Sequence, residues 1–307
     1  MSSFDAYLSL KGIISGDVLA DEKLAFHTSY RIGGPADLFI TVDNYNDLRT
    51  TIAILESNAI PWVMFGKGTN ILVSDEGYRG AVIVLGKEFN HFAFDEEDPT
   101  RVSVGAGVSI ARMVQESFRR GLSGLEMLVG VPGTVGGAVV MNAGTREQWI
   151  GQVVESLVVY RPHEGLKRYM HKDIAWFYRQ TTIAPQDIVL EVVLALRQSD
   201  IVHLRAKMEA SLSKRKKSQP LNKASCGSVF LNPPDKSVAQ LIEAAGLKGY
   251  QHGGAQVSDV HANFIVNNGR ASAQDVLSVM KVVKDKVGRL YGVELKPEVK
   301  FLGFEKN

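Results

Sequence analysis

Two glycine-rich segments with little charge constrain this chain more than any other feature. The first is Gly66-Lys67-Gly68-Thr69-Asn70, and the second runs over residues 130–138 and continues to Asn142-Ala143-Gly144. Glycine has no Cβ, so clusters of it occur where the backbone must approach another group closely. The 29 glycines are about 9% of the 307 residues, above the roughly 7% that proteins average. The fold must therefore accommodate two stretches of backbone that carry few side chains.

Each glycine-rich segment has a ligand-binding interpretation and a structural one. Converging N–H groups in residues 66–70, with the Thr69 and Asn70 side chains, suit a phosphate group, and a tight turn with a solvated lysine is the alternative. Segment 130–138 suits a planar ligand or a crossing of closely packed strands. Residues 66–70 are not a P-loop, because no glycine lies five residues before a Gly-Lys-[Ser/Thr] triplet. Gly105-Ala106-Gly107 lacks the third glycine of a Rossmann fingerprint, which disfavours a Rossmann dehydrogenase.

Composition and charge limit the class of protein. The 35 Lys and Arg against 33 Asp and Glu leave a formal charge of +2, which argues against a nucleic-acid protein with a global basic field. The single cysteine, Cys226, excludes an intrachain disulfide, and none of the seven histidines lies in a metal-binding pattern, so we expect no metal. The first residues do not resemble a signal peptide, and no run approaches the roughly 18 apolar residues of a membrane span. We therefore expect a cytoplasmic protein.

Periodicity predicts a chain that mixes helices and strands. Helices are expected over residues 45–58, 109–121, 201–218, 237–245 and 272–292, the last with a capping box from Ser272 and Asp275. Strands are expected over residues 62–65, 71–73, 81–85, 101–104, 153–160 and 188–196, with a final strand over 293–301. The change from strands to a charged helix places the main domain boundary near residue 200.

A set of motifs, in order along nearly the whole chain, resembles a known family. The motifs are His27-Thr28-Ser29-Tyr30-Arg31-Ile32-Gly33-Gly34-Pro35-Ala36-Asp37, residues 66–73, residues 130–138, Tyr178-Arg179, Gly227-Ser228-Val229-Phe230 and Pro297-Glu298-Val299-Lys300-Phe301. With them the chain resembles the more compact type of the UDP-N-acetylmuramate dehydrogenase (UDP-N-acetylenolpyruvoylglucosamine reductase, MurB) family of bacterial peptidoglycan synthesis. Each motif alone is weak, and their joint occurrence carries the resemblance.

The resemblance implies an α+β fold: a FAD-binding region of the vanillyl-alcohol-oxidase/PCMH type, with two α+β subdomains, plus a smaller α+β substrate domain. It implies one FAD-binding subdomain over residues 1–80 with the C-terminal strand 299–307, a second over 81–200, and a substrate domain over 201–298. FAD would be held non-covalently. The implied cofactor-binding residues are Gly66, Lys67, Gly68, Thr69, Asn70, Ile71, Gly130, Pro132, Gly133, Thr134, Gly136, Gly137, Ala138 and Asn142.

The resemblance also implies an acid–base site. Ser228 would protonate the reaction intermediate, Arg179 would bind the substrate carboxylate and the enolate, and Glu298 would lie at the enolate site. Without the resemblance, the patterns favour a turn serine, a surface arginine and a glutamate on the solvated face of the final strand. Tyr178, Arg215 and Asn232 would bind substrate, although a basic run such as residues 214–217 is usually a solvated helix face. Cys226 is expected to be a bystander, and for His261 a structural role and a place near the substrate pocket are equally open.

The implied activity is reduction, with NADPH and FAD, of UDP-N-acetylglucosamine enolpyruvyl ether to UDP-N-acetylmuramate. We expect a monomer that binds NADPH and this nucleotide substrate and interacts with neither nucleic acid nor membrane. Two alternatives stay open. A flavin oxidase on the same scaffold would consume oxygen and have no use for Ser228. A nucleotide-binding regulator would keep the glycine loops and show no turnover.

Overall fold

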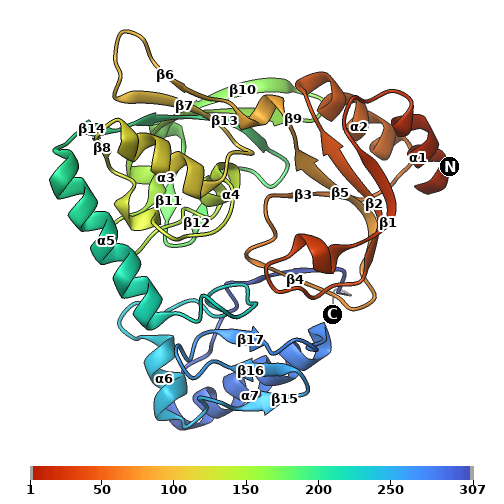
Figure 1. Ribbon diagram of the computed structural model, residues 1–307. Coiled ribbons are helices and arrows are strands. Elements are labelled where there is room, and N and C mark those ends of the chain that lie inside the picture. The colour runs from red at the N-terminus through yellow and green to blue at the C-terminus, as the bar shows by residue number, and fades with distance from the viewer. Residues whose placement is uncertain (1–2, 305–307) are drawn as a thin grey trace. The chain divides into compact units, whose positions relative to one another are not determined.

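The structure, a computed structural model, describes residues 3–304 (Figure 1). The chain forms two compact units, each assembled from segments that are distant in sequence. The first unit takes in the described residues up to 20, together with 38–66 and 80–213, and the second takes in 21–37, 67–79 and the described residues from 214 onward. The expected three-part division at residues 80, 200 and 298 stays a prediction.

The larger strands form two sheets. A four-stranded sheet has the order β1 (Val18–Lys23), β2 (Pro35–Val42), β5 (Tyr78–Leu85) and β3 (Trp62–Phe65). A five-stranded sheet has the order β10 (Gly165–Met170), β9 (Val154–Arg161), β13 (Ile188–Ala195), β7 (Arg101–Gly105) and β6 (Phe92–Phe94). Neighbours in the second sheet are antiparallel, whereas β3 and β5 run parallel.

Helices of the first unit bury the apolar faces that their spacing predicts. Helix α2 (Tyr45–Ser57) begins at Asn44, whose side chain accepts the N–H of Asp47, and it buries Leu48, Ile52 and Leu55 in one core with α1 (Ser3–Lys11). Helices α3 (Ile110–Arg119) and α4 (Val135–Val140) share a second core with β7 and β13. The five-stranded sheet contributes to both cores, because Tyr160, Ile188 and Leu190 lie in the core of α1 and α2. Figure 1 shows these helices and sheets.

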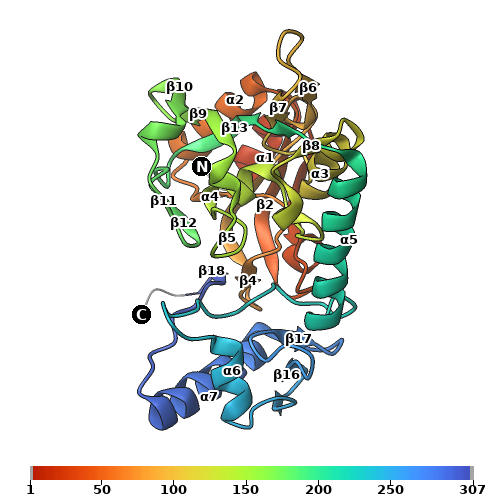
Figure 2. The same cartoon turned by 90° about the vertical axis from the view of Figure 1, so that its left-hand side faces the viewer.

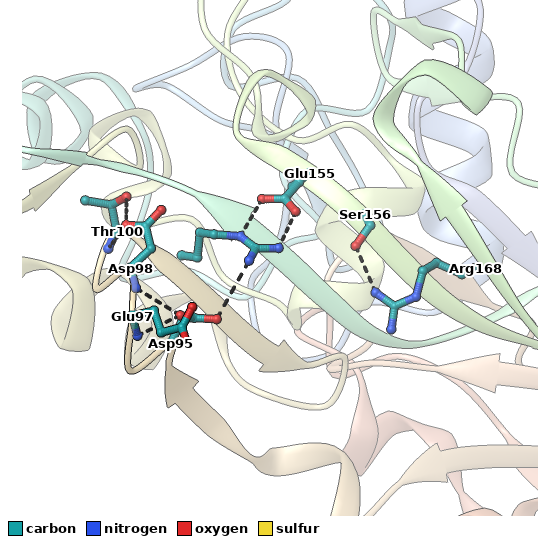
Figure 3. A network of polar contacts seen from close by, with 8 residues as sticks. Asp95, Glu97, Asp98, Thr100, Glu155, Ser156 and Arg168 are labelled. Atoms are coloured by element: carbon teal, nitrogen blue, oxygen red, sulfur yellow. Dashed lines mark hydrogen bonds and ion pairs between the residues drawn. The ribbon is translucent and has the colours of Figure 1, made fainter.

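An ion-pair network lies on the five-stranded sheet. Arg101 of β7 donates from Nε to Glu155 of β9 at 2.9 Å, and its guanidinium lies 3.7 Å from Asp95 (Figure 3). Asp95 in turn accepts the N–H groups of Glu97 and Asp98 in the turn between β6 and β7. These side chains are partly exposed, so water screens the charges and the pairs add little stability.

The second unit has one small sheet with two helices beside it. Strands β15 (Gln251–His252), β16 (Ala255–Val257) and β17 (Ile265–Asn267) are antiparallel, and α6 (Val238–Ala244) and α7 (Ala273–Tyr291) share their core (Figure 2). Helix α7 has the predicted Ser272–Asp275 capping box and ends at Gly292, which has the left-handed φ of 64°. A separate parallel pair joins β4 (Ile71–Val73) to β18 (Lys300–Leu302).

The remaining elements are short, apart from one long helix. Helix α5 spans Ile201–Ser218, as predicted. The others are η1 (Leu24–His27), η2 (Glu88–Asn90), η3 (Glu126–Leu128), η4 (Ile150–Gln152), η5 (His171–Asp173), the pair β8 (Leu122–Ser123) with β14 (Arg197–Gln198), and the hairpin β11 (Trp176–Phe177) with β12 (Gln180–Thr181). Among residues 3–304, no helix is both long and apolar enough to span a membrane.

Two expectations about elements need correction. The final strand, expected over residues 293–301, covers only Lys300–Leu302, because residues 293–299 make no regular ladder and Pro297, which cannot donate an N–H, forms an isolated bridge with Phe230. Segment 130–138 is not a loop throughout, because α4 begins at Val135. The expected ranges also leave out two long strands of the larger sheets, β1 and β2, the strands β6 and β10 at the edges of the five-stranded sheet, and the short strands β8, β11, β12, β14, β15, β16 and β17.

Candidate functional site

The glycine-rich segments of the first unit meet at Thr134. A Cβ added to Gly66 would lie 2.5 Å from Oγ1 of Thr134, so no side chain fits there. Thr134 also pairs with Ser109, and Gly136 donates its N–H to the carbonyl of Ala106 at 2.9 Å. Three segments that are distant in sequence, around residues 66, 106–109 and 134–136, are thereby brought together.

The N–H groups at the start of α4 are already bound within the protein. Val135 donates to Val108 at 2.9 Å, Gly137 to Oγ1 of Thr134 at 3.3 Å, and Ala138 to the Thr134 carbonyl at 2.9 Å. These bonds make the segment rigid. A ligand on this surface would have to draw its hydrogen bonds from residues before Val135.

Asn142 holds this segment to the β11–β12 hairpin. Its buried amide donates to the carbonyl of Phe177 at 2.8 Å, and its Oδ1 accepts the N–H of Gly151 at 3.2 Å. The side chain thus has a structural role, and contact of Asn142 with a cofactor stays a prediction.

Tyr178 and Arg179 form the turn of that hairpin in the first unit. Arg179 has a φ of 59°, in the left-handed region that a residue other than Gly or Asn seldom adopts. Its guanidinium donates to the carbonyl of Gly144 at 2.8 Å and lies 5.1 Å from the centre of the Tyr178 ring. A strained backbone held by tertiary contacts is typical of a functional position.

Arg146 was missed by the sequence reasoning. Its guanidinium lies 5.7 Å from the centre of the Tyr178 ring, so two cations share this aromatic side chain. The only signal in the sequence was a basic residue two positions after Gly144, which alone is not distinctive.

In the second unit, the loop that begins at Lys67 packs on the segment His27–Ser29. Ser29 donates its N–H to the carbonyl of Gly68 at 3.1 Å. Gly68 has a φ of 56°, and a Cβ there would clash with the carbonyl oxygen of His27. The first motif of the chain therefore supports the second one directly.

Ser228 and Glu298 are brought to neighbouring positions in the second unit. Ser228 pairs with Phe264 in an isolated bridge, and the next residue, Val229, accepts the N–H of Glu298 at 2.8 Å. Asn70 donates from Nδ2 to the Glu298 carbonyl at 3.2 Å. Glu298 is half-buried rather than on the solvated strand face that alternation alone suggests.

Cys226 lies close to Ser228 in sequence and is buried. Burial raises the pKa of its thiol to about 12, and the charge of Glu298 adds to that rise, whereas a hydrogen bond with Tyr30 opposes it. Tyr30 is buried too and donates its phenol to the Ile265 carbonyl at 2.9 Å. The thiol is therefore held protonated, which fits a bystander.

Two of the expected substrate-binding residues lie in the second unit. Arg215 is partly buried and donates to Oε1 of Gln219 at 3.1 Å, whereas Lys214, Lys216 and Lys217 are exposed. Asn232 accepts the N–H of Val238 at the start of α6, at 2.9 Å. Contact of either side chain with substrate stays a prediction.

His261 has a structural role in its own loop. Its Nδ1 accepts the N–H of Asn263 at 3.3 Å, its ring packs edge-on against Phe264, and burial lowers the pKa of the imidazole. Asn263 in turn holds Phe230 through both its amide atoms. This loop therefore supports the segment that carries Ser228.

The donor set of the glycine-rich segments suits a negatively charged cofactor. Residues 66–71 and 130–142 contain no Asp or Glu, while Lys67, Thr69 and Thr134 supply an ammonium group and two hydroxyls. Each segment taken by itself can approach an anionic group without repulsion from a carboxylate of its own. Within residues 3–304, no cluster of three or more His, Cys, Asp or Glu side chains is placed to hold a metal ion.

Comparison with known proteins gives two family models that together cover most of the chain. The model described as "FAD binding domain" matches residues 36–163, and "UDP-N-acetylenolpyruvoylglucosamine reductase, C-terminal domain" matches residues 219–302. These matches agree with the fold class that the resemblance implied.

Curated relatives and a solved structure match over nearly the full length. The UDP-N-acetylenolpyruvoylglucosamine reductase of Halalkalibacterium halodurans is 40% identical over 96% of this chain and 97% of its own. The enzyme named UDP-N-acetylenolpyruvoylglucosamine reductase 2 of Symbiobacterium thermophilum is 43% identical over 94% of this chain and 93% of its own. The crystal structure of the Thermus caldophilus reductase superposes with a TM-score of 0.81 at 34% identity, covering 94% of this chain and all of that one.

Proposed function

Because this chain belongs to the UDP-N-acetylenolpyruvoylglucosamine reductase family, we propose that it reduces the enolpyruvyl ether of UDP-N-acetylglucosamine to UDP-N-acetylmuramate with NADPH. It is a flavin-dependent reductase of peptidoglycan precursor synthesis. One observation of the structure supports the proposed grouping of Ser228 and Glu298. The peptide of Glu298 is hydrogen-bonded to Val229, the residue that follows Ser228.

The FAD-binding domain suggests which residues would hold the cofactor. We assign the pyrophosphate to the loop Gly66–Ile71, which supplies ammonium and hydroxyl donors, and the flavin to residues 130–142, because neither segment contains a carboxylate. When bound, FAD supplies hydride transfer between the nicotinamide and the substrate. Binding is proposed to be non-covalent.

The reduction adds a hydride to the terminal carbon of the enolpyruvyl group and a proton to the carbon that bears the carboxylate. We assign this proton to the hydroxyl of Ser228, which solvent then reprotonates. A serine hydroxyl is a weak acid, so it serves only when geometry is enforced and the acceptor is a strong base such as an enolate. Two neighbouring segments, Asn263–Phe264 and Pro297–Glu298, fix the backbone around Ser228.

Arg179 and Glu298 would serve the charged intermediate. A guanidinium binds a planar carboxylate with two parallel hydrogen bonds and stays charged at any working pH, which suits Arg179 for the substrate carboxylate and the enolate. The strained turn presents Arg179 on a hairpin that Asn142 anchors. Glu298 is assigned to the enolate site, beside the carbon that is protonated.

The proposal extends to substrate contacts and to the state of the protein. Tyr178, Arg215 and Asn232 are assigned to the UDP-sugar. NADPH as the donor, a monomeric state, a cytoplasmic location and the lack of contact with nucleic acid or membrane remain predictions.

Oxidation of NADPH by the purified protein tests this function. We expect a yellow protein whose NADPH oxidation requires the enolpyruvyl nucleotide. A rate that ignores this substrate but follows oxygen consumption identifies a flavin oxidase. A colourless protein whose melting temperature rises with UDP-sugars, without turnover, identifies a binding protein.

The half-reactions test the role of Ser228. Ser228→Ala should leave reduction of the flavin by NADPH near the wild-type rate and block reduction of the substrate. If both half-reactions fall together, Ser228 is not the proton donor.

A further inference from the structure

Asn70 connects the glycine-rich loop of the second unit to the residue assigned to acid–base chemistry. The side-chain Nδ2 of Asn70 donates to the backbone carbonyl of Glu298 at 3.2 Å. The backbone carbonyl of Asn70 accepts the N–H of Lys300 at 2.9 Å. Asn70 lies directly before β4, whose pairing with β18 begins at Ile71 and Lys300. The bond from the Asn70 side chain to Glu298 therefore joins the two segments beyond the last backbone hydrogen bond of the β4–β18 pair.

The peptides on both sides of the Glu298 Cα are held by protein groups. The N–H of Glu298 donates to Val229 at 2.8 Å, and its carbonyl accepts from Asn70. The residues before Lys300 form no regular strand, so a sheet ladder does not place them. Residues on both sides of Glu298 are held to the segment of Ser228, since Leu231 donates its N–H to the Lys296 carbonyl at 2.9 Å and Phe230 forms a bridge with Pro297. Asn70 adds a side-chain bond to the Glu298 carbonyl from another part of the chain.

We propose that Asn70 is a positioning residue for Glu298: its amide holds the Glu298 peptide where the carboxylate can serve the protonated carbon. This inference rests on the proposed function. It changes the part expected of Asn70, because one of its two amide hydrogens is committed to Glu298 rather than to a phosphate. The same loop that would bind the cofactor therefore also sets the place of the acid–base residue.

Two variants and one control test the contact. Asn70→Ala removes the donor, and Asn70→Asp keeps the shape but places a carboxylate oxygen against the Glu298 carbonyl. Because small misplacements of reacting groups reduce rates strongly, we expect reduction of the substrate to fall by about 10- to 100-fold. Reduction of flavin by NADPH, measured at saturating FAD, should fall much less than reduction of the substrate, so the ratio of the two rates changes.

Ser74→Ala is the matched control in the same pair of strands. Ser74 lies at the other end of the β4–β18 pair, where its N–H donates to Leu302 at 2.9 Å and its hydroxyl accepts the N–H of Glu76 at 3.2 Å. This variant should leave both half-reactions unchanged. FAD affinity, read from the quenching of flavin fluorescence, is measured for each variant so that the half-reactions of Asn70→Ala can be compared at saturating FAD, and Ser74→Ala should bind FAD as the wild type does.

A double-mutant cycle with Glu298→Gln separates positioning from a general effect. If Asn70 acts through Glu298, Asn70→Ala should slow substrate reduction far less in the Glu298→Gln background than in the wild type. Equal fold-losses in both backgrounds overturn the proposal, and so does an equal fall of both half-reactions at saturating FAD. A wild type without substrate-dependent NADPH oxidation contradicts the proposed function instead, so the two failures are distinguishable.

Discussion

At the scale of single residues, the positions proposed for substrate and acid–base chemistry are fixed by contacts with neighbouring segments rather than by the backbone preference of the residues themselves. Arg179 occupies a backbone conformation that suits glycine, and its guanidinium compensates by binding the Gly144 carbonyl. Glu298 lies in a segment without a regular ladder, and its peptide groups are bonded to Val229 and to the side chain of Asn70. Such local conflicts concentrate at functional sites because tertiary contacts must outweigh them there.

The strain at Arg179 predicts an order of stability between two variants. Arg179→Gly and Arg179→Ala both lose the guanidinium, but only glycine adopts a φ of 59° without steric cost. We expect Arg179→Gly to be more stable than Arg179→Ala by about 1 kcal/mol, although both lose activity. Chemical denaturation of the two variants measures the difference. Equal stabilities would show that the turn relaxes once the arginine is removed.

The buried thiol predicts low reactivity. With its pKa raised to about 12, Cys226 carries about one thiolate per ten thousand molecules at pH 8. We expect a disulfide reagent to label the folded protein very slowly at this pH and the protein in guanidinium chloride at the rate of a free thiol. Fast labelling of the native protein would mean that Cys226 opens to solvent and that the segment carrying Ser228 is mobile.

At the scale of elements, two parts of the chain bind the N–H groups in the first turn of helix α7. The Ser272–Asp275 capping box is local, whereas Asp75 reaches from the loop after β4. Its two carboxylate oxygens accept the N–H groups of Ala273 at 2.8 Å and Gln274 at 3.1 Å. A carboxylate at a helix N-terminus satisfies free N–H groups and interacts well with the helix dipole.

We expect that removing the Asp75 carboxylate from the start of α7 lowers the stability of the protein measurably. Asp75→Ala should lower the free energy of unfolding by about 1 kcal/mol. Glu76→Ala, next to it and also exposed, is the control and should change stability by less than about 0.5 kcal/mol. Denaturant unfolding followed by circular dichroism gives both values. If both variants lower stability equally, the loss comes from the removal of a surface charge and not from the hydrogen bonds of Asp75 to α7.

At the scale of the whole molecule, the two units have separate cores and separate titrating groups. Burial lowers the pKa of His261 in the second unit. The folded form then binds fewer protons than the unfolded form between that lowered pKa and about pH 6.5. Stability from this residue is complete above about pH 6.5 and is lost as the pH falls toward the lowered pKa.

This linkage predicts a pH-dependent loss of stability in one unit. His261→Asn keeps a hydrogen-bond acceptor near the position of Nδ1 but does not titrate, so its stability should fall less than that of the wild type between pH 7.5 and 5. Hydrogen exchange at both pH values should show the difference in β16, β17 and α7 rather than in the five-stranded sheet. Parallel pH profiles for wild type and variant would contradict it.

The sequence alone determined the helices with caps and periodic apolar faces, such as Ser272 to Gly292, because those signals act over a few residues. The order of short motifs along the chain was also sufficient to indicate the family. Only the tertiary structure decided that Gly66 packs on Thr134, that residues 293–299 are not a strand, and that Asn70 holds Glu298 across 228 positions. Contacts between segments distant in sequence leave no periodic trace in either segment, since each depends on the packing of the whole unit.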